Sequence, residues 1–200
     1  TLNTLLREEE LPRAEETAAL ASAAGVDALI VQDVGLARRL RASLPALPLH
    51  ASTQLSCHTP AGVRFLRDAG FSRVVLSREM SREEIAACAA LGVELEVFVH
   101  GALCMSVSGQ CYFSAMLGGR SGNRGLCAQT CRLPFAPTGE VPRPATATQA
   151  ALSLKDNCLV AYVGELAQLG VASLKIEGRM KRPEYVAAAT AVYAAAAAGR

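Results

Sequence analysis

One short pattern recurs four times along the chain and constrains the fold more than any other feature. In each copy, an Ala- and Leu-rich helix end leads to a glycine, and a short apolar run then closes on polar residues. Glycine suits the left-handed cap that ends a helix, and the apolar run suits a strand buried on both faces. The four copies are ASAAGVDALIVQD, RDAGFSRVVLSRE, AALGVELEVFVHG and AQLGVASLKIEGR, with Gly25, Gly70, Gly92 and Gly170 at the turn.

Helical segments lie between these runs, so that strand and helix alternate roughly every 20–25 residues, as in βαβ units around a parallel sheet. The number of strands is too large for a small open sheet and too small for a closed eight-stranded barrel. We therefore predict an α/β fold, an incomplete (β/α) TIM-like barrel with parallel strands, with a doubly wound open sheet as the alternative. Strands are expected near Leu2, Leu29, Leu49, Val75, Val97 and Leu174, and helices over 14–24, 34–43, 59–69, 81–91, 157–169 and 183–198.

The region between Gly101 and Ala151 breaks this rhythm. It has little periodicity, many Gly and Pro residues, and four of the seven cysteines of the chain. Long irregular insertions in compact domains are commonly functional or disordered, and the reactive residue types here favour a functional one. We predict a single domain with barrel units over 1–100, a long Cys-rich insertion over 101–151 and the last barrel units over 152–200. Because the sequence opens at Thr1, inside an apparent strand, we also expect a fragment of a longer protein.

The composition gives no electrostatic argument for nucleic acid or membrane as a default partner. Hydrophobic residues make up 51% and charged residues 19%, and the net charge is +2. The amino end, TLNTLLREEELPRAEE, is charged where a secretory signal needs an apolar stretch, and YVAAATAVYAAAAAG is short for a membrane span. We expect a cytoplasmic protein with no membrane partner. In that reducing compartment, seven cysteines favour metal binding or catalysis over disulfides.

The cysteines give the sharpest chemical signal. Six residues separate Cys104 from Cys111, fifteen separate Cys111 from Cys127, and three separate Cys127 from Cys131. Thiolates are soft ligands for zinc or iron–sulfur centres, and this wide, glycine-rich spacing is unlike that of a zinc ribbon. It favours an iron–sulfur cluster wrapped by one loop, with zinc or no metal as alternatives. Buried thiols that only fill space are the other interpretation, which suits Cys57 and Cys88.

Polar side chains follow successive predicted strands, where functional groups collect in parallel α/β folds. Together they would form a polar mouth able to bind an anionic small molecule; the alternative is that they only mark where strands meet water. His100, four residues before Cys104, could ligate metal, donate to a cluster sulfur or shuttle a proton. Arg120, Arg124 and Arg132 could contact an RNA backbone. The catalytic candidates are His50, Gln54, Glu79, His100, Lys175, Glu177 and Arg179.

Several motifs resemble one known family. Residues 96–114, EVFVHGALCMSVSGQCYFS, resemble the signature of peptidase family U32, the collagenase-like peptidases, although Phe113 stands where that signature prefers an aliphatic residue. The blocks SGNRGLCAQTCRLPF, LSLKDNCL and SLKIEGRMKRPEYV resemble those that follow in the family, in the same order. HASTQL and VVLSRE resemble blocks that precede the signature. The resemblance therefore extends over nearly the whole chain.

The resemblance implies a function. Some family members are associated with collagen degradation. Others are associated with hydroxylation of a tRNA uridine or a ribosomal-RNA cytidine, using prephenate and an iron–sulfur cluster. A divergent group takes part in ubiquinone hydroxylation as heterodimers. The present motifs look closest to the ribosomal-RNA cytidine branch. By resemblance, Cys104, Cys111 and Cys127 would ligate a 4Fe–4S cluster, with Cys131 or Cys158 as the fourth ligand. The expected function is RNA hydroxylation with an anionic cosubstrate such as prephenate; the alternatives are a collagenase-like peptidase and a non-catalytic, cluster-carrying subunit. The expected partners are RNA, the anionic small molecule, and a protein partner or second copy.

Overall fold

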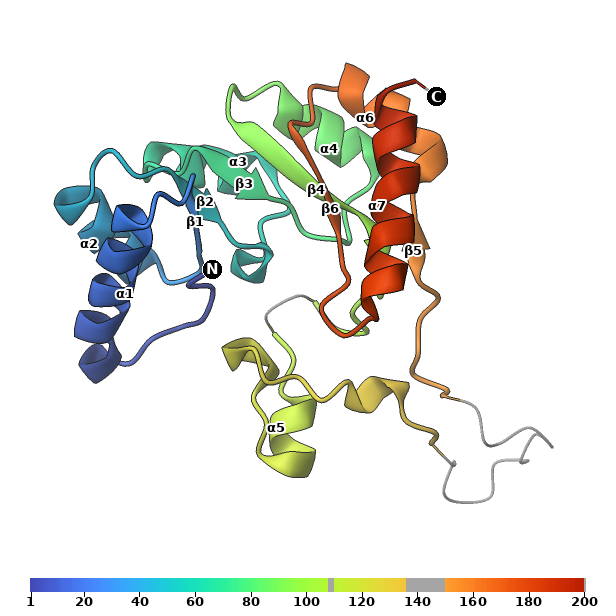
Figure 1. Ribbon diagram of the computed structural model, residues 1–200, viewed down its shortest axis with the longest axis horizontal. Coiled ribbons are helices and arrows are strands. Elements are labelled where there is room, and N and C mark those ends of the chain that lie inside the picture. The colour runs from blue at the N-terminus through green and yellow to red at the C-terminus, as the bar shows by residue number, and fades with distance from the viewer. Residues whose placement is uncertain (108–109, 136–149, 200) are drawn as a thin grey trace.

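The computed structural model describes residues 1–107, 110–135 and 150–199, and its centre is one curved sheet (Figure 1). The strands are β1 (Leu29–Val31), β2 (Leu49–Ala51), β3 (Arg73–Val75), β4 (Glu94–Gly101), β5 (Asn157–Cys158) and β6 (Ser173–Ile176). Strands β1 to β4 lie side by side in chain order and β6 pairs with β4, all in the parallel sense. The predicted α/β fold with a parallel sheet is therefore confirmed. The expected strand near Leu2 is a single parallel bridge to Val31.

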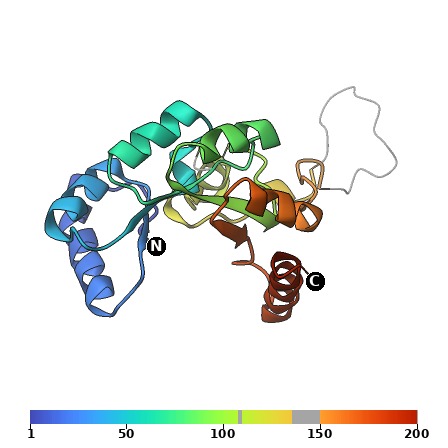
Figure 2. The same cartoon turned by 90° about the horizontal axis from the view of Figure 1, so that it is seen from above.

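Helices alternate with the strands along the chain, and α1 to α4 form an arc along one side of the sheet (Figure 2). The α-helices are α1 (Leu11–Ala23), α2 (Val34–Ser43), α3 (Pro60–Asp68), α4 (Arg82–Ala89), α5 (Phe113–Gly118), α6 (Val163–Gln168) and α7 (Pro183–Ala197). Short 3-10 turns occupy Glu8–Glu10, Thr53–Leu55, Gly122–Arg124, Thr130–Arg132 and Val160–Tyr162. Among the described residues, no helix is both long enough and apolar enough to cross a bilayer.

Local sequence signals explain where these elements begin and end. Gly25, Gly70, Gly92 and Gly170 all adopt a positive φ, between +70° and +94°, directly before the strands that they were predicted to introduce. At the start of α4, the Ser81 side chain accepts the backbone N–H of the third helical residue, whose carboxylate in turn accepts the N–H of Ser81. Such caps satisfy donors that the first helical turn leaves unpaired. The alternation of helix and strand is therefore encoded locally.

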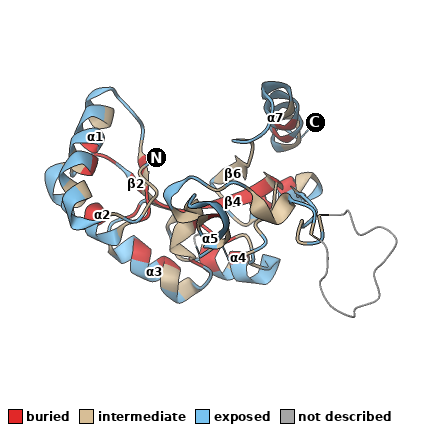
Figure 3. Ribbon diagram, turned by 90° about the horizontal axis from the view of Figure 1, so that it is seen from below, coloured by how far each residue is buried: buried red, intermediate tan, exposed pale blue. Residues whose placement is uncertain are grey.

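Apolar side chains on the helix side of the sheet form the core. Along β4, Leu95, Val97 and Val99 alternate, and all three belong to the buried cluster. Leu49 and Val74 on the neighbouring strands are at most 1% exposed and contribute to the same cluster. Figure 3 shows this burial concentrated on the strands and on the sides of the helices that face them.

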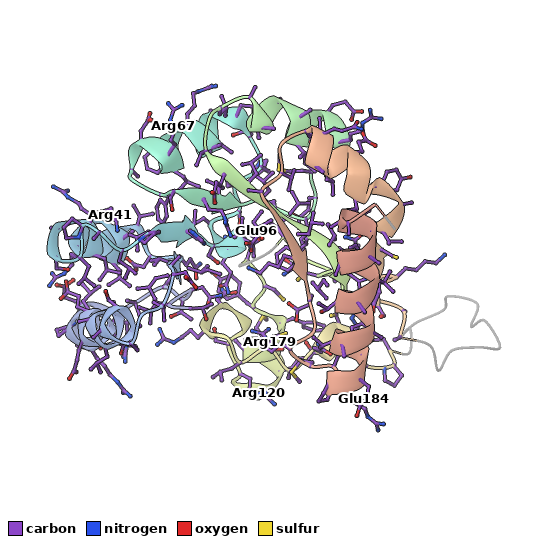
Figure 4. The ribbon with its side chains drawn as sticks, turned by 45° about the horizontal axis from the view of Figure 1, so that its top comes forward. Arg41, Arg67, Glu96, Arg120, Arg179 and Glu184 are labelled. Carbon is purple, nitrogen blue, oxygen red and sulfur yellow. The ribbon has the colours of Figure 1, made fainter. Side chains whose placement is uncertain are left out.

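The opposite face of the sheet carries charge. Residues Leu95 to Val99 of β4 are all buried, so the expectation of a strand buried on both faces is confirmed for β4, whereas every residue of β6 is only partly buried. His50 and Arg73 stand in register on adjacent strands. Glu96, 7% exposed, accepts hydrogen bonds from Lys175 Nζ at 2.6 Å and Ser173 Oγ at 3.0 Å. Arg73 Nη1 lies 3.6 Å from Glu96 Oε2. We call Arg73, Glu96, Ser173 and Lys175 the Glu96 network; Figure 4 labels Glu96 at the middle of the sheet. Its hydrogen bonds compensate for the burial of charge.

One predicted helix starts later than expected. The sequence suggested a helix over 157–169, but α6 begins at Val163 and the residues before it pair with β4. The Asn157 side chain donates to Phe98 O at 3.1 Å, and the backbone N–H of Leu159 donates to Val99 O at 2.9 Å. These bonds satisfy carbonyl groups on a distant strand, which local helix propensity cannot anticipate. The prediction is therefore wrong for the first part of this segment.

The cysteine segment, defined here as residues 102–135, leaves the end of β4 and lies beyond the sheet (Figure 1). It contains α5 and two 3-10 turns, and among its described residues only Ser114 is buried. The predicted insertion extended over 101–151. Residues 108–109 and 136–149 of it lie outside the described residues, so the extent of the insertion stays a prediction.

Gly101 holds the ends of β4 and β6 together. Its φ is +105°, and a Cβ placed there would lie 2.4 Å from the carbonyl oxygen of Glu177. We expect Gly101→Ala to lower the free energy of unfolding by about 2–3 kcal/mol, because the strand ends must move apart. Gly92→Ala is the matched control: its φ is +70°, its Cβ would meet no atom within 4 Å, and the expected loss is about 1 kcal/mol. Urea denaturation measures both, and equal losses would contradict the close approach.

Candidate functional site

A cavity of about 360 Å³ lies between the carboxyl ends of the strands and the cysteine segment. Its strand-side wall is formed by Phe98 on β4 and by residues that follow β2, β3 and β6. Figure 4 shows Arg179 at the end of the sheet nearest the cysteine segment. Four of the seven predicted catalytic residues line this cavity, namely Gln54, Lys175, Glu177 and Arg179.

The cysteine segment supplies the other wall. Cys104, Cys111, Cys127 and Cys131 all line the cavity, and each is partly buried. None of the seven cysteines of the chain is in a disulfide. Cys158 is exposed on β5 and is not a cavity residue. The structure therefore groups Cys131, and not Cys158, with the three thiols that the resemblance marks as ligands.

The sulfur of Cys127 sits among hydrogen-bond donors. The backbone N–H of Gln129 donates to Cys127 Sγ at 3.3 Å, and the Ser114 hydroxyl lies 3.9 Å from the same sulfur. Gln129 adopts a left-handed backbone conformation, with a φ of 55°. Ser114 Oγ also accepts the backbone N–H of Ala128 at 3.0 Å, which fixes the turn around the sulfur. Hydrogen bonds of this kind are also made to the sulfurs of iron–sulfur clusters.

Cys104 lies in a more apolar part of the wall. Burial raises the pKa of its thiol, while the backbone N–H of Ser106 and the guanidinium of Arg78 oppose that rise. The neighbouring Cys111 and Cys131 raise the pKa further, because a second and third negative charge would be unfavourable nearby. Cys104 therefore keeps its proton at neutral pH unless a bound cation replaces it.

The donor set can be compared with two kinds of metal centre. Within the described ranges, no three His, Cys, Asp or Glu side chains stand close enough together to hold a single metal ion. Four cysteines on one cavity, with an N–H group donated to a sulfur, are the usual donors of an iron–sulfur cluster. A cluster is larger than a zinc ion, so its ligands stand farther apart. The four cavity cysteines are therefore compatible with an iron–sulfur cluster.

Two arginines attach the cysteine segment to the rest of the fold. The guanidinium of Arg132 donates to Leu154 O at 2.6 Å and to Leu103 O at 2.7 Å. Arg124 Nη2 lies 2.5 Å from Glu10 Oε1, in the turn before α1. Sequence analysis considered both arginines as RNA contacts; in the structure their guanidinium groups hold chain segments together.

Three predicted catalytic residues lie outside the cavity and stay predictions. His50 sits within β2 on the charged face, where burial lowers the pKa of its imidazole. Glu79 is exposed. His100 turns toward α7, with its ring centroid 5.6 Å from that of Tyr185 and 5.4 Å from that of Tyr193. The structure therefore does not bring His100 together with the cysteines.

One cavity residue was missed by the sequence analysis. Arg78 follows β3 and lines the cavity, with its guanidinium carbon 4.3 Å from the centroid of the Phe98 ring. Its Nε is buried and has no hydrogen-bond partner among the described residues. The sequence contained a signal, the polar strand end Ser77-Arg78-Glu79, from which only Glu79 was chosen. Which of two adjacent residues turns inward depends on the path of the chain after the strand.

Comparison with known proteins gives two kinds of relative. Residues 1–198 match the model of peptidase family U32. The chain is 45% identical over 194 residues to the 23S rRNA 5-hydroxycytidine C2501 synthase of Escherichia coli (strain K12), covering 96% of this chain and 29% of that protein. It is 35% identical over 205 residues to tRNA hydroxylation protein P1 of Bacillus subtilis (strain 168), covering 96% and 47%. A collagenase of Porphyromonas gingivalis (strain ATCC BAA-308 / W83) is 33% identical over 204 residues, covering 93% and 48%. The chain thus spans less than half the length of each of these relatives.

Proposed function

The chain belongs to peptidase family U32, and from this premise we propose that it takes part in RNA hydroxylation, as an iron–sulfur protein that uses an anionic cosubstrate such as prephenate. The relatives named for hydroxylation of ribosomal and transfer RNA, at 45% and 35% identity, support this direction. The observation that carries the proposal is that four cysteines and several cationic or polar side chains line one cavity. We place this cavity at the rim of an incomplete TIM-like barrel, where active sites of such folds lie, and the reaction in the cytoplasm.

In this proposal, Cys104, Cys111, Cys127 and Cys131 would hold a 4Fe–4S cluster, which supplies one-electron redox chemistry when it is bound. The side chains must lose their protons to act as ligands. The N–H of Gln129 donates to Cys127 Sγ, and Cys104, whose pKa is raised, would release its proton on binding. The Arg132 bonds to Leu103 and Leu154 fix the backbone on both sides of the cavity.

The proposed cosubstrate would occupy the strand-side half of the cavity. A volume of about 360 Å³ suits a small organic acid. Arginine side chains hydrogen-bond carboxylates in a charge-assisted manner, and Arg78 and Arg179 both line this half. Lys175 lines it too, but its ammonium group is hydrogen-bonded to Glu96 at 2.6 Å, which neutralises much of its charge. The Glu96 network is therefore better suited to shaping the wall than to binding the ligand.

A collagenase-like peptidase is the main alternative, and one relative carries that name at 33% identity. Peptide hydrolysis needs a nucleophile with a nearby base, or a metal-bound water. Cys104 with His100, which stands four residues before it, is the pair to consider. In the structure His100 packs against two tyrosine rings outside the cavity, and the pKa of the Cys104 thiol is raised, so the pair lacks the features of an activated nucleophile.

The test is the loss of a modified nucleoside in a strain that lacks the gene. Nucleosides from ribosomal and transfer RNA of the deletion strain and its parent are compared by mass spectrometry. We expect one hydroxylated nucleoside to disappear and to return when the gene is restored. If every hydroxylated nucleoside persists, the RNA proposal fails. If the nucleoside disappears but the purified protein cannot form it from RNA and prephenate without a second protein, the chain is instead part of a cluster-carrying subunit.

A further inference from the structure

We propose that Arg78, lying against the ring of Phe98, binds a carboxylate group of the small-molecule ligand in the cavity. The inference deepens the proposed function and rests on it for the identity of the ligand as a small acid. It assigns the anion contact to Arg78, a position that the sequence analysis passed over, and not to Lys175.

The backbone that carries Arg78 is held rigidly. Leu76 N donates to Glu96 O at 3.0 Å, and Ser77 N donates to Cys57 O at 2.9 Å, so both residues before Arg78 are tied to neighbouring segments. Leu76 is 1% exposed and Ser77 6% exposed. A ligand contact that starts from such a fixed backbone loses little conformational freedom on binding.

The guanidinium group is positioned but not neutralised. Its carbon lies 4.3 Å from the Phe98 ring centroid, so one face of the group is covered by the ring. None of the ion pairs among the described residues includes Arg78, and its buried Nε has no hydrogen-bond partner there. A buried donor without an acceptor is costly, and an arginine fork matches the two oxygens of a carboxylate. The arrangement is therefore complete only when an anion is bound.

The other cations of the cavity are less suited to this contact. Lys175 Nζ is 2.6 Å from a Glu96 oxygen and is part of the Glu96 network. Arg179 is exposed at the rim, in the loop after β6. Arg132 also lines the cavity, but its guanidinium donates to Leu103 O and Leu154 O. Arg78 is thus the interior cation of the cavity with neither a carboxylate nor a carbonyl partner among the described residues.

Gln54 also lines the cavity, and its backbone is fixed because the side-chain amide of Gln32 donates to Gln54 O at 3.3 Å. Its Oε1 is buried by protein atoms and so is not assigned a contact with the ligand. The class of ligand is therefore set by Arg78, as a small carboxylic acid.

Isothermal titration calorimetry with prephenate as the probe tests the assignment on the purified protein. We expect Arg78→Met to weaken binding by about 10- to 100-fold, the usual range for a charge-assisted hydrogen bond. Arg78→Lys keeps the charge but not the planar fork, and about a tenfold loss is expected. Arg38→Met on α2, an exposed arginine outside the cavity, serves as the control and should bind like the parent.

Thermal unfolding of each variant establishes that it is folded. If the Arg78→Met protein does not fold, the affinity of the Arg78→Lys protein tests the inference. Equal affinity of the parent and the Arg78 variants would overturn the inference, as would the absence of prephenate binding to the parent. The nucleoside comparison with the deletion strain separates this failure from failure of the proposed function. If prephenate binding depends on Arg78 but deletion of the gene removes no nucleoside, only the RNA proposal is refuted. If binding does not depend on Arg78 but deletion removes a hydroxylated nucleoside, only the Arg78 inference is refuted.

Discussion

Replacement of Cys111 by Ser is expected to abolish the visible absorbance of the anaerobically purified protein and to reduce RNA hydroxylation to the level of the deletion strain. Cys111 lines the cavity with three other cysteines. A serine hydroxyl is a harder and far weaker ligand for iron than a thiolate, so a cluster that loses one of four thiolates is not retained. Absorbance spectra, together with iron and sulfide analysis, give the result.

Two further serine variants serve as controls for this experiment. Cys88 is fully buried in α4 within the apolar core, and Cys88→Ser should retain the colour even if the protein is less stable. Cys158→Ser should also retain it, because that thiol is exposed outside the cavity. A Cys111→Ser protein that keeps its full iron content, or a parent protein that contains stoichiometric zinc and no iron, would refute the cluster proposal. Loss of colour in Cys158→Ser alone would move the fourth ligand from Cys131 to Cys158.

The second large effect is expected at Glu96, in the sheet itself. Glu96→Gln leaves Lys175 and Arg73 without their buried anion, and the side chains of these two residues are only 30% and 25% exposed. Breaking one side of a buried charge network commonly costs about 3–5 kcal/mol, and we expect about 3 kcal/mol here. Urea denaturation monitored by circular dichroism measures the change.

Glu94→Gln is the matched control on the same strand. Glu94 also pairs with Arg73, at 2.7 Å, but its side chain is 54% exposed, so its removal should cost less than about 1 kcal/mol. Similar losses for both variants would mean that burial does not distinguish the two carboxylates. The double variant Glu96→Met with Lys175→Met should recover part of the loss, since no unpaired charge of that pair remains.

The same site predicts how stability depends on pH. Burial alone would raise the pKa of Glu96, but the hydrogen bond and charge of Lys175, followed by Ser173 and Arg73, outweigh it and lower the pKa below the ordinary 4.5. Since the unfolded chain then binds this proton more tightly, the stabilisation is complete above about pH 4.5 and disappears as the pH falls through the folded pKa. The Glu96→Gln protein should lack this part of the acid sensitivity.

The order of elements was predictable because its signals are local. The glycines at 25, 70, 92 and 170 end helices through their own backbone freedom, and Ser81 starts a helix through its own side chain. By contrast, Asn157 lies in a segment of acceptable helix propensity, and its pairing with β4 depends on a strand more than fifty residues away. Long-range pairing of that kind leaves no periodic trace in a single sequence.

The site was predictable in its residue types more than in its geometry. Strand ends identified Gln54, Lys175 and Glu177 as cavity residues because carboxyl ends of parallel strands meet at one edge. The positions of the strand ends did not predict that Glu96, within an apolar run, neutralises Lys175. They also did not predict that His100 turns toward α7. Those outcomes depend on which face of the sheet each side chain reaches, and on what the neighbouring strand places opposite it.

The cysteine segment buries almost nothing of its own, since Ser114 is its only buried described residue. Hydrophobic burial therefore contributes little to its order, which depends on polar bonds such as those of Arg132 and on whatever its sulfurs hold. Its amide hydrogens should exchange with solvent long before those of β4, through openings that leave the sheet intact. In the proposed function, loading of the four thiols and local folding of the cysteine segment would be a single equilibrium, and the affinity for the cluster would include the free energy of ordering the segment around it.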